Sequence, residues 1–326
     1  MKYFILIMSL VLLIEWNTYD ANAEFGIAPC MYAGDDDETG IYCPKAAMDP
    51  SSLPIDCTSF VYDAGVLFDD QYANDLGLDE DYNVQMLLYT NKPLYLYIRY
   101  EKSKCSTNDK DNTTHNINNI KHLLDKYNIT GFILYNSLEL NSTINCDDNL
   151  KQYVSIVKQN TSRQIGLYVN AKNMIDDTNN ATATGCGIVP LNNSNYSLTT
   201  FANALNKSKI AKDKMYLLFS VNPTINDTTT EDLPKCCVTY QKYCENDHYN
   251  TYWCADNADS LYQKGKFAKD IHAKGIVIRY IDTIDPAATC DCNNQDKFIS
   301  FTMMLRGYLS EDPIKDCAKL NSITDT

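Results

Sequence analysis

The stretch NITGFILYNSLELN, residues Asn128–Asn141, decides how the fold of this chain is predicted. An apolar run rises from Ile129 and ends in polar residues, which is typical of a buried strand that presents a site at its end. A helix-like segment precedes this run, and its apolar residues recur at steps of three or four. They are Ile117, Ile120, Leu123 and Leu124. A helix packed on a core, followed by a buried strand, is one unit of an α/β fold.

The same unit recurs along the chain. Strands are predicted at Phe25–Met31, Cys57–Val66, Pro93–Tyr100, Thr130–Tyr135, Gln164–Val169, Lys214–Val221 and Lys274–Ile281. Helices are predicted at Ile117–Lys126, Asp147–Lys158, Leu198–Asn206 and Asp256–His272. Strands that alternate with helices pair in parallel through right-handed crossovers. Seven or eight such units predict a closed (β/α)8 barrel of the TIM type.

The N-terminus has the features of a secretory signal peptide. Lys2 precedes an apolar run from Tyr3 to Ile14, and Ala21-Asn22-Ala23 fits the small-x-small cleavage pattern. The alternative, a membrane anchor, is disfavoured because a spanning helix needs about 20 apolar residues. We predict a signal peptide over residues 1–23 and one secreted barrel domain over residues 24–326.

Cysteines and glycosylation sequons agree with an extracellular location. Thirteen cysteines follow the predicted leader, and an oxidising compartment converts most such thiols into disulfides. N-glycosylation is predicted at Asn112, Asn128, Asn141, Asn160, Asn180, Asn192, Asn195, Asn206 and Asn226. Zinc binding is the alternative role for the cysteines, but the four histidines do not show the spacing typical of zinc ligands. We therefore predict no metal and no cofactor.

The net charge of the chain disfavours two classes of binding partner. A formal net charge of −14 disfavours nucleic acids and anionic membranes, both of which reward basic patches. We therefore expect neither a nucleic acid nor a membrane as partner, and we expect a monomer.

Four stretches together resemble the family 18 glycoside hydrolases, the chitinases and chitinase-like proteins. They are Cys30-Met31-Tyr32 with Pro54–Tyr62, NINNIKHLLDKYNITGFILYNS (116–137), SLTTFANALNKSKIAKDKMYLLFSV (197–221) and NADSLYQKGKFAKDIHAKGIVIRYIDTID (257–285). In the family's order they correspond to the first two strands, the catalytic fourth strand, the seventh strand and the eighth strand. The match is loosest between Asp147 and Leu198, where one strand is found instead of two. The barrel is therefore expected to be irregular there, and the family's α+β insertion to be absent.

The resemblance also implies disulfides. The family's first two strands carry paired cysteines, which implies a bond between Cys30 and Cys57. Cys105 and Cys146 follow the third and fourth strands, which are neighbours in the barrel, so we predict a second bond between them.

The catalytic motif of the family is degenerate in this chain. Family 18 enzymes carry D-G-x-D-x-D-x-E, whose alternate acids point into the barrel. Aligned on Gly131, the acidic positions hold Thr130, Ile133, Tyr135 and Ser137. None of these side chains is a carboxylic acid. Glu139 is a substitute acid only if a bulge brings it back by two residues, and a solvated loop carboxylate is the alternative.

The end of the last strand departs from the family as well. The family places a Trp there under the central sugar, and the matching position here is Arg279, followed by Tyr280. Asp282 and Asp285 match an acidic pair of the family, with a cap or a loop ion pair as the alternative. We predict Tyr135, Arg279, Tyr280 and Asp282 as binding residues.

Three functions remain open from the sequence. The first is a catalytically inactive chitinase-like protein that binds a glycan or a protein at the barrel mouth. The second is a hydrolase of altered specificity that uses Glu139, Asp282 or Asp285. The third is an extracellular effector that acts through its outer surface.

Overall fold

The structure is a computed structural model. It describes residues 9–13, 25–34, 48–67, 78–100, 121, 125–136, 158–159, 163–170, 202–203, 212–220, 224–225, 253–254, 256–283, 292 and 298–322. The predicted helices at 117–126, 147–158 and 198–206 lie mostly outside these ranges.

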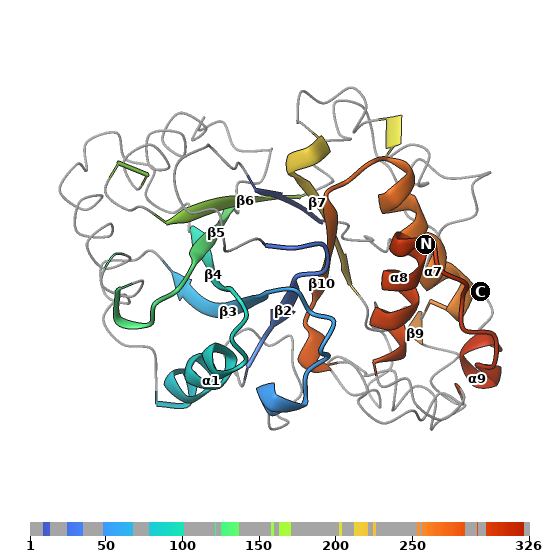
Figure 1. The fold of residues 1–326 in the computed structure, drawn as a ribbon, viewed down its shortest axis with the longest axis horizontal. Coiled ribbons are helices and arrows are strands. Elements are labelled where there is room, and N and C mark those ends of the chain that lie inside the picture. The colour runs from blue at the N-terminus through green and yellow to red at the C-terminus, as the bar shows by residue number, and fades with distance from the viewer. Residues whose placement is uncertain are drawn as a thin grey trace.

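A closed barrel forms the centre of the molecule (Figure 1). Its parallel strands are β2 (Cys30–Tyr32), β3 (Phe60–Leu67), β4 (Leu94–Tyr100), β5 (Gly131–Asn136), β6 (Gln164–Asn170), β7 (Met215–Ser220) and β10 (Gly275–Arg279). All seven predicted strands are present, with ends that shift by a few residues and a first strand reduced to Cys30–Tyr32. The predicted barrel is confirmed.

The barrel closes through a strand that the sequence did not predict. β1 (Ser9–Leu13) lies between β6 and β7 and pairs with both in antiparallel orientation. This is the side where the predicted barrel lacked a strand. β1 also falls within the predicted signal peptide, and the cleavage of residues 1–23 stays a prediction.

Alternate strand residues separate two apolar layers, as the two-residue period of a strand requires. One layer fills the barrel and includes Met31, Val61, Tyr97, Ile133 and Val277. Phe25 lies in this layer near the amino ends of the strands, where its ring makes T-shaped contacts with Tyr95 and Tyr216 at centroid distances of 4.8 and 4.9 Å. The interior is therefore a packed core and not a pore.

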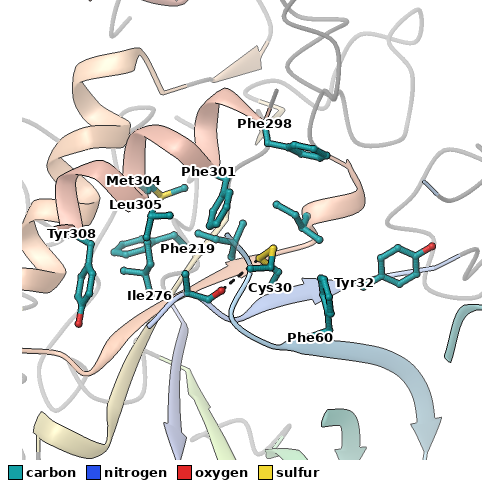
Figure 2. Packing of buried hydrophobic residues seen from close by; sticks show 14 of the residues in the cluster. Cys30, Tyr32, Phe60, Phe219, Ile276, Phe298, Phe301, Met304, Leu305 and Tyr308 are labelled. Atoms are coloured by element: carbon teal, nitrogen blue, oxygen red, sulfur yellow. Dashed lines mark hydrogen bonds between the residues drawn. A yellow bond between two sulfur atoms is a disulfide. The ribbon is translucent and has the colours of Figure 1, made fainter. Parts of the chain in front are cut away.

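The other layer lies between the strands and the surrounding helices. These are α1 (Leu78–Tyr89), α7 (Ala258–Asp270), α8 (Ile299–Leu309) and the short α9 (Ala318–Asn321). Figure 2 shows Phe301, Met304 and Leu305 of α8 gathered above the strand residues Phe219 and Ile276. Helix α7 agrees with the prediction at Asp256–His272, and its first turn is capped by Asn257, whose side chain accepts from the Ser260 N–H at 2.8 Å.

Short elements complete the described structure. They are the 3-10 turns η1 (Pro50–Ser52), η2 (Lys212–Lys214) and η4 (Ile281–Thr283), and a small ribbon of β8 (Thr224–Ile225) and β9 (Trp253–Cys254). Among the helices described, none has the length and apolar character needed to cross a membrane.

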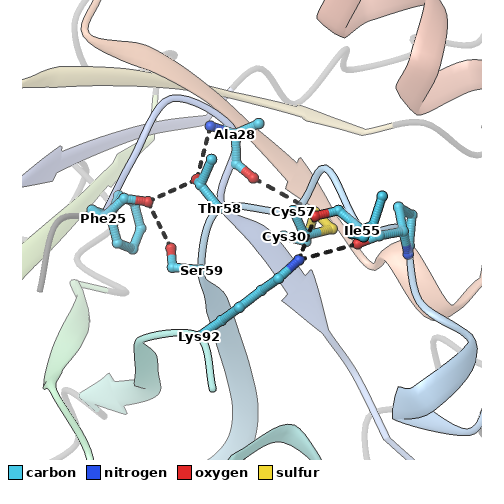
Figure 3. Close-up of a disulfide and its surroundings, with 9 residues drawn as sticks. Phe25, Ala28, Cys30, Ile55, Cys57, Thr58, Ser59 and Lys92 are labelled. Atoms are coloured by element: carbon cyan, nitrogen blue, oxygen red, sulfur yellow. Dashed lines mark hydrogen bonds between the residues drawn. A yellow bond between two sulfur atoms is a disulfide. The ribbon is translucent and has the colours of Figure 1, made fainter. Parts of the chain in front are cut away.

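The cysteines 30 and 57 form a disulfide with an S–S distance of 2.02 Å, as predicted (Figure 3). The neighbouring backbone is held as well, because the Phe25 carbonyl accepts from the hydroxyls of Thr58 at 2.9 Å and Ser59 at 2.8 Å. A disulfide that the sequence did not predict joins Cys292 to Cys317. Cys105 and Cys146 lie outside the described residues, so their pairing stays a prediction.

Candidate functional site

The candidate site lies where the carboxyl ends of three neighbouring strands meet. β2 lies between β3 and β10 in the barrel. Asp63 is on β3, Ala33 and Gly34 follow β2, and Tyr280 follows β10. Ala33 is small and belongs to the same interior cluster as Tyr280. We call this set of residues, together with Arg279 and Asp282, the barrel mouth.

Tyr280 connects the two outer strands of the barrel mouth. Its backbone has φ of 62°, a left-handed conformation that is uncommon for a residue with a side chain. The side chain joins the barrel interior and is 5% exposed. Its hydroxyl donates to Asp63 Oδ2 at 2.8 Å. A strained backbone at the end of a barrel strand thus places a phenol against a buried carboxylate.

Arg279 lies over Tyr280. One guanidinium nitrogen, Nη2, donates to the Tyr280 hydroxyl at 3.2 Å, and the guanidinium carbon is 4.7 Å from the centre of the ring. The predicted binding residue Tyr280 therefore has one ring face covered by a cation. This face is therefore less available for stacking on a sugar ring.

Asp63 is a candidate residue that the sequence analysis missed. It is 4% exposed and its carboxylate lies inside the barrel mouth, where it accepts a hydrogen bond from the Tyr280 hydroxyl. One signal in the sequence could have revealed it: a single acid within the apolar strand FVYDAGV, two residues after inward-facing Val61. Buried carboxylates are retained where a partner or a ligand satisfies them.

Asp282 holds the segment that follows β2. Its Oδ1 accepts from the Ala33 N–H at 3.0 Å, and its Oδ2 accepts from the Gly34 N–H at 3.1 Å. Gly34 has φ of 74°, a conformation that suits glycine. This arrangement agrees with the loop-capping alternative considered for Asp282. A contact between Asp282 and a ligand stays a prediction.

Burial raises the pKa of the Asp282 carboxyl from 3.8 to about 7, although the two N–H donors oppose this rise and the charge of Asp63 adds to it. Between these pKa values the folded state binds more protons than the unfolded state. The stabilising contribution of Asp282 is therefore complete below about pH 4 and is lost as the pH rises through 7.

We predict that the melting temperature of the Asp282→Asn variant changes less between pH 5 and pH 8 than that of the unmodified protein. Equal pH profiles would contradict the raised pKa.

The degenerate motif lies on β5. Ile133 is 1% exposed inside the barrel, opposite Tyr97 of β4 and Gly166 of β6. An apolar side chain therefore occupies the inward position at which the resemblance places an acid. Thr130 precedes β5 and is partly exposed, and the backbone of Tyr135 pairs with Arg99 and Tyr168.

Several predicted residues lie outside the described part of the chain. They are Ser137, Glu139, Asp285 and the glycosylation sites other than Asn128. Asn128 is exposed and has φ of 48°, so its side chain is accessible to modification. Within the described ranges, no group of three or more His, Cys, Asp or Glu residues is arranged to hold a metal ion.

Solved structures with the same architecture settle the fold. Catalytic domain 2 of the Group II chitinase of Ostrinia furnacalis superposes with a TM-score of 0.61 at 12% identity, over 92% of this chain and 100% of that one. The fold is that of the chitinases.

Other solved chitinase-type proteins agree with this assignment. A chitinase from Bacteroides thetaiotaomicron gives a TM-score of 0.57 at 13% identity, over 88% of this chain and 98% of that one. YKL-39, solved in the presence of chitooligosaccharides, gives 0.52 at 10% identity, over 86% and 99%. No protein-family model and no curated protein matches the chain. At these identities the likeness concerns the fold and does not assign an activity.

Proposed function

We propose that this chain is a secreted glycan-binding protein with a chitinase fold that does not hydrolyse glycosides by the family 18 mechanism. The observation that carries the proposal is Ile133, which is buried in the barrel interior at the place where the resemblance puts an acid. That mechanism needs a carboxyl group to protonate the glycosidic oxygen and another to orient the acetamide of the substrate. An isoleucine can do neither.

The barrel mouth is the proposed binding site. Barrels of this type bind ligands at the carboxyl ends of their strands, which is where Asp63, Arg279 and Tyr280 lie. YKL-39 and a mutant of the Ostrinia domain have been solved with chitooligosaccharides. A carboxylate that accepts and a guanidinium that donates suit the hydroxyls of a neutral sugar. Arg279, Tyr280, Tyr135 and Asp282 are the proposed contacts, with Asp63 added from the structure.

The proposed extracellular location rests on two features of the chain. The predicted signal peptide and the two disulfides support an extracellular location, since disulfides persist in oxidising compartments.

The test combines binding and turnover. We predict that the purified protein binds N-acetylglucosamine oligomers in calorimetry and releases no shorter sugar from them over days. Replacing Arg279 by alanine should weaken binding about tenfold, because a charged hydrogen-bond donor is lost. Lys266→Ala is the matched control, since it removes an exposed cation of α7 that pairs with Asp270 on the outer surface. Absence of binding, or equal effects of both substitutions, would refute the mouth as the site.

A hydrolase of altered specificity is the second candidate, favoured by the buried carboxylate of Asp63 inside the barrel mouth. It predicts turnover that Asp63→Asn abolishes, or that Glu139→Gln abolishes if the substitute acid acts. The same assay separates it from the binding proposal.

A further inference from the structure

Helix α1 carries an exposed face that the barrel mouth does not use. Tyr82 is 55% exposed and Tyr89 is 75% exposed, which is unusual for large aromatic side chains. Gln85 is also exposed, and Met86 is partly exposed. Positions i, i+3, i+4 and i+7 share one side of a helix. We call these four residues the tyrosine stripe.

The opposite face of α1 holds the helix in place. Val84 and Leu87 are fully buried in the layer between the barrel and its helices. Asn83 is buried too, and its Oδ1 lies 3.3 Å from the hydroxyl of Tyr32 on β2. Helix α1 is therefore fixed against the barrel wall on the outer side of the molecule (Figure 1), and its two tyrosines are exposed to solvent.

The spacing of the two rings is set by the helix. Seven residues advance about 10 Å along the axis and turn the side chain by only about 20° from its starting direction. This advance is close to the length of one disaccharide unit of a β-1,4-linked polysaccharide. Two rings at this spacing can each meet an equivalent sugar of one extended chain. Gln85 lies between them, where its amide can both donate to and accept from the sugar groups.

Charge favours the same kind of ligand. None of the four residues of the tyrosine stripe is charged, although the chain as a whole carries a net charge of −14. An uncharged aromatic surface on an acidic protein suits a neutral polymer better than a charged one. Sugar rings present flat apolar faces that pack on aromatic rings.

We propose that the tyrosine stripe is a second glycan site, which binds an extended β-1,4-linked N-acetylglucosamine polymer at the surface of insoluble chitin. The inference rests on the proposed glycan-binding function and extends it. The barrel mouth binds a soluble oligomer, and the tyrosine stripe attaches the protein to the solid polymer. The two sites are on different parts of the fold and can be tested separately.

The experiment measures depletion of the purified, secreted protein from solution by chitin powder, with calorimetry on soluble oligomers in parallel. Tyr82→Ala and Tyr89→Ala should each lower the partition coefficient about fivefold, which corresponds to one aromatic contact. The double variant should lower it about 25-fold, because the two rings act on separate sugars and their effects multiply. Leu309→Ala is the matched control, since it removes an exposed apolar side chain of α8.

A shifted variant tests the spacing itself. The double substitution Gln85→Tyr with Tyr89→Gln keeps two tyrosines on the face but places them about 4.5 Å apart along the axis. It should bind chitin as weakly as Tyr89→Ala, whereas Tyr82→Phe should bind as well as the unmodified protein. Melting temperatures check that all variants are folded.

Each outcome decides the inference. If the double alanine variant still binds chitin, or if the shifted variant binds it as well as the unmodified protein does, the second site is refuted. The proposal for the barrel mouth is unaffected by either result. An unmodified protein that binds soluble oligomers but not chitin would have the same consequence. Binding of chitin without binding of oligomers would support the tyrosine stripe and reject the barrel mouth. Binding of neither would reject both.

Discussion

Replacing Gly265 by alanine is expected to lower the free energy of unfolding by about 3 kcal/mol or more, because the new methyl group has no space. A Cβ atom at this position would overlap the backbone carbonyl of Met304 and crowd the backbone nitrogen of Tyr308. Gly307 faces the backbone of Tyr262 in the same way. Helices α7 and α8 therefore touch almost backbone to backbone. Alanine favours a helix over glycine by about 1 kcal/mol, and this gain is smaller than the cost of moving two packed helices apart.

The measurement is chemical denaturation of the secreted protein, with the secreted amount as a second readout. Lys266→Ala is the control, because the neighbouring side chain is exposed and a substitution there should change stability by about 0.5 kcal/mol or less. A Gly265→Ala variant that unfolds at the same denaturant concentration as the unmodified protein would show that α7 and α8 separate easily.

The same two helices show what the sequence reveals of this fold. α7 lies where a helix was predicted, and the structure shows a buried face and a capping Asn257. α8 was missed because buried residues fill most of its circumference, from Ile299 and Ser300 to Leu305 and Tyr308. Its outer face is narrow and consists of Thr302, Arg306 and Leu309, of which Leu309 is apolar, so the contrast between the two faces is weak in the sequence.

Helix α1 was missed for the opposite reason. Its exposed Tyr82 and Tyr89 are large and aromatic, so the contrast between a buried and an exposed face is weak in the sequence. The exposed aromatic side chains that weaken the helical pattern are also the ones that make the outer face of α1 a candidate site.

The candidate site was only partly predictable. The inward position of Ile133 follows from the two-residue period of a strand, and the structure confirms it. The same period places Arg279 inward and Tyr280 outward. The left-handed backbone at Tyr280 reverses this direction and brings its hydroxyl to Asp63, a residue 217 positions away. A pattern of apolar and polar residues does not predict the positive φ of Tyr280. Nor does cysteine spacing fix the bond between Cys292 and Cys317 when a chain has thirteen cysteines.

Replacing Tyr280 by phenylalanine should lower the free energy of unfolding by about 1.5–3 kcal/mol, the usual range for a hydrogen bond to a charged group. The substitution keeps the ring and removes the hydroxyl that donates a hydrogen bond to Asp63 Oδ2, with the two oxygens 2.8 Å apart, so a buried carboxylate loses a donor. Tyr308→Phe is the control. Its hydroxyl is also buried, but it lies 2.9 and 2.7 Å from the neutral carbonyls of Ala273 and Lys274, and its loss should cost about 1 kcal/mol.

A double-mutant cycle separates this bond from the packing of the ring. In the Asp63→Val background the carboxylate is absent, and Tyr280→Phe should then cost only the hydrogen bond from Arg279 Nη2, about 1 kcal/mol or less. An equal cost in both backgrounds would show that Tyr280 does not stabilise Asp63. If the cycle gives the expected coupling, the Asp63 carboxyl group is stabilised by the Tyr280 hydroxyl, and a sugar hydroxyl at the barrel mouth can replace or join the phenol. Calorimetry on the same four proteins then measures whether loss of the carboxylate weakens oligomer binding more than loss of the phenol.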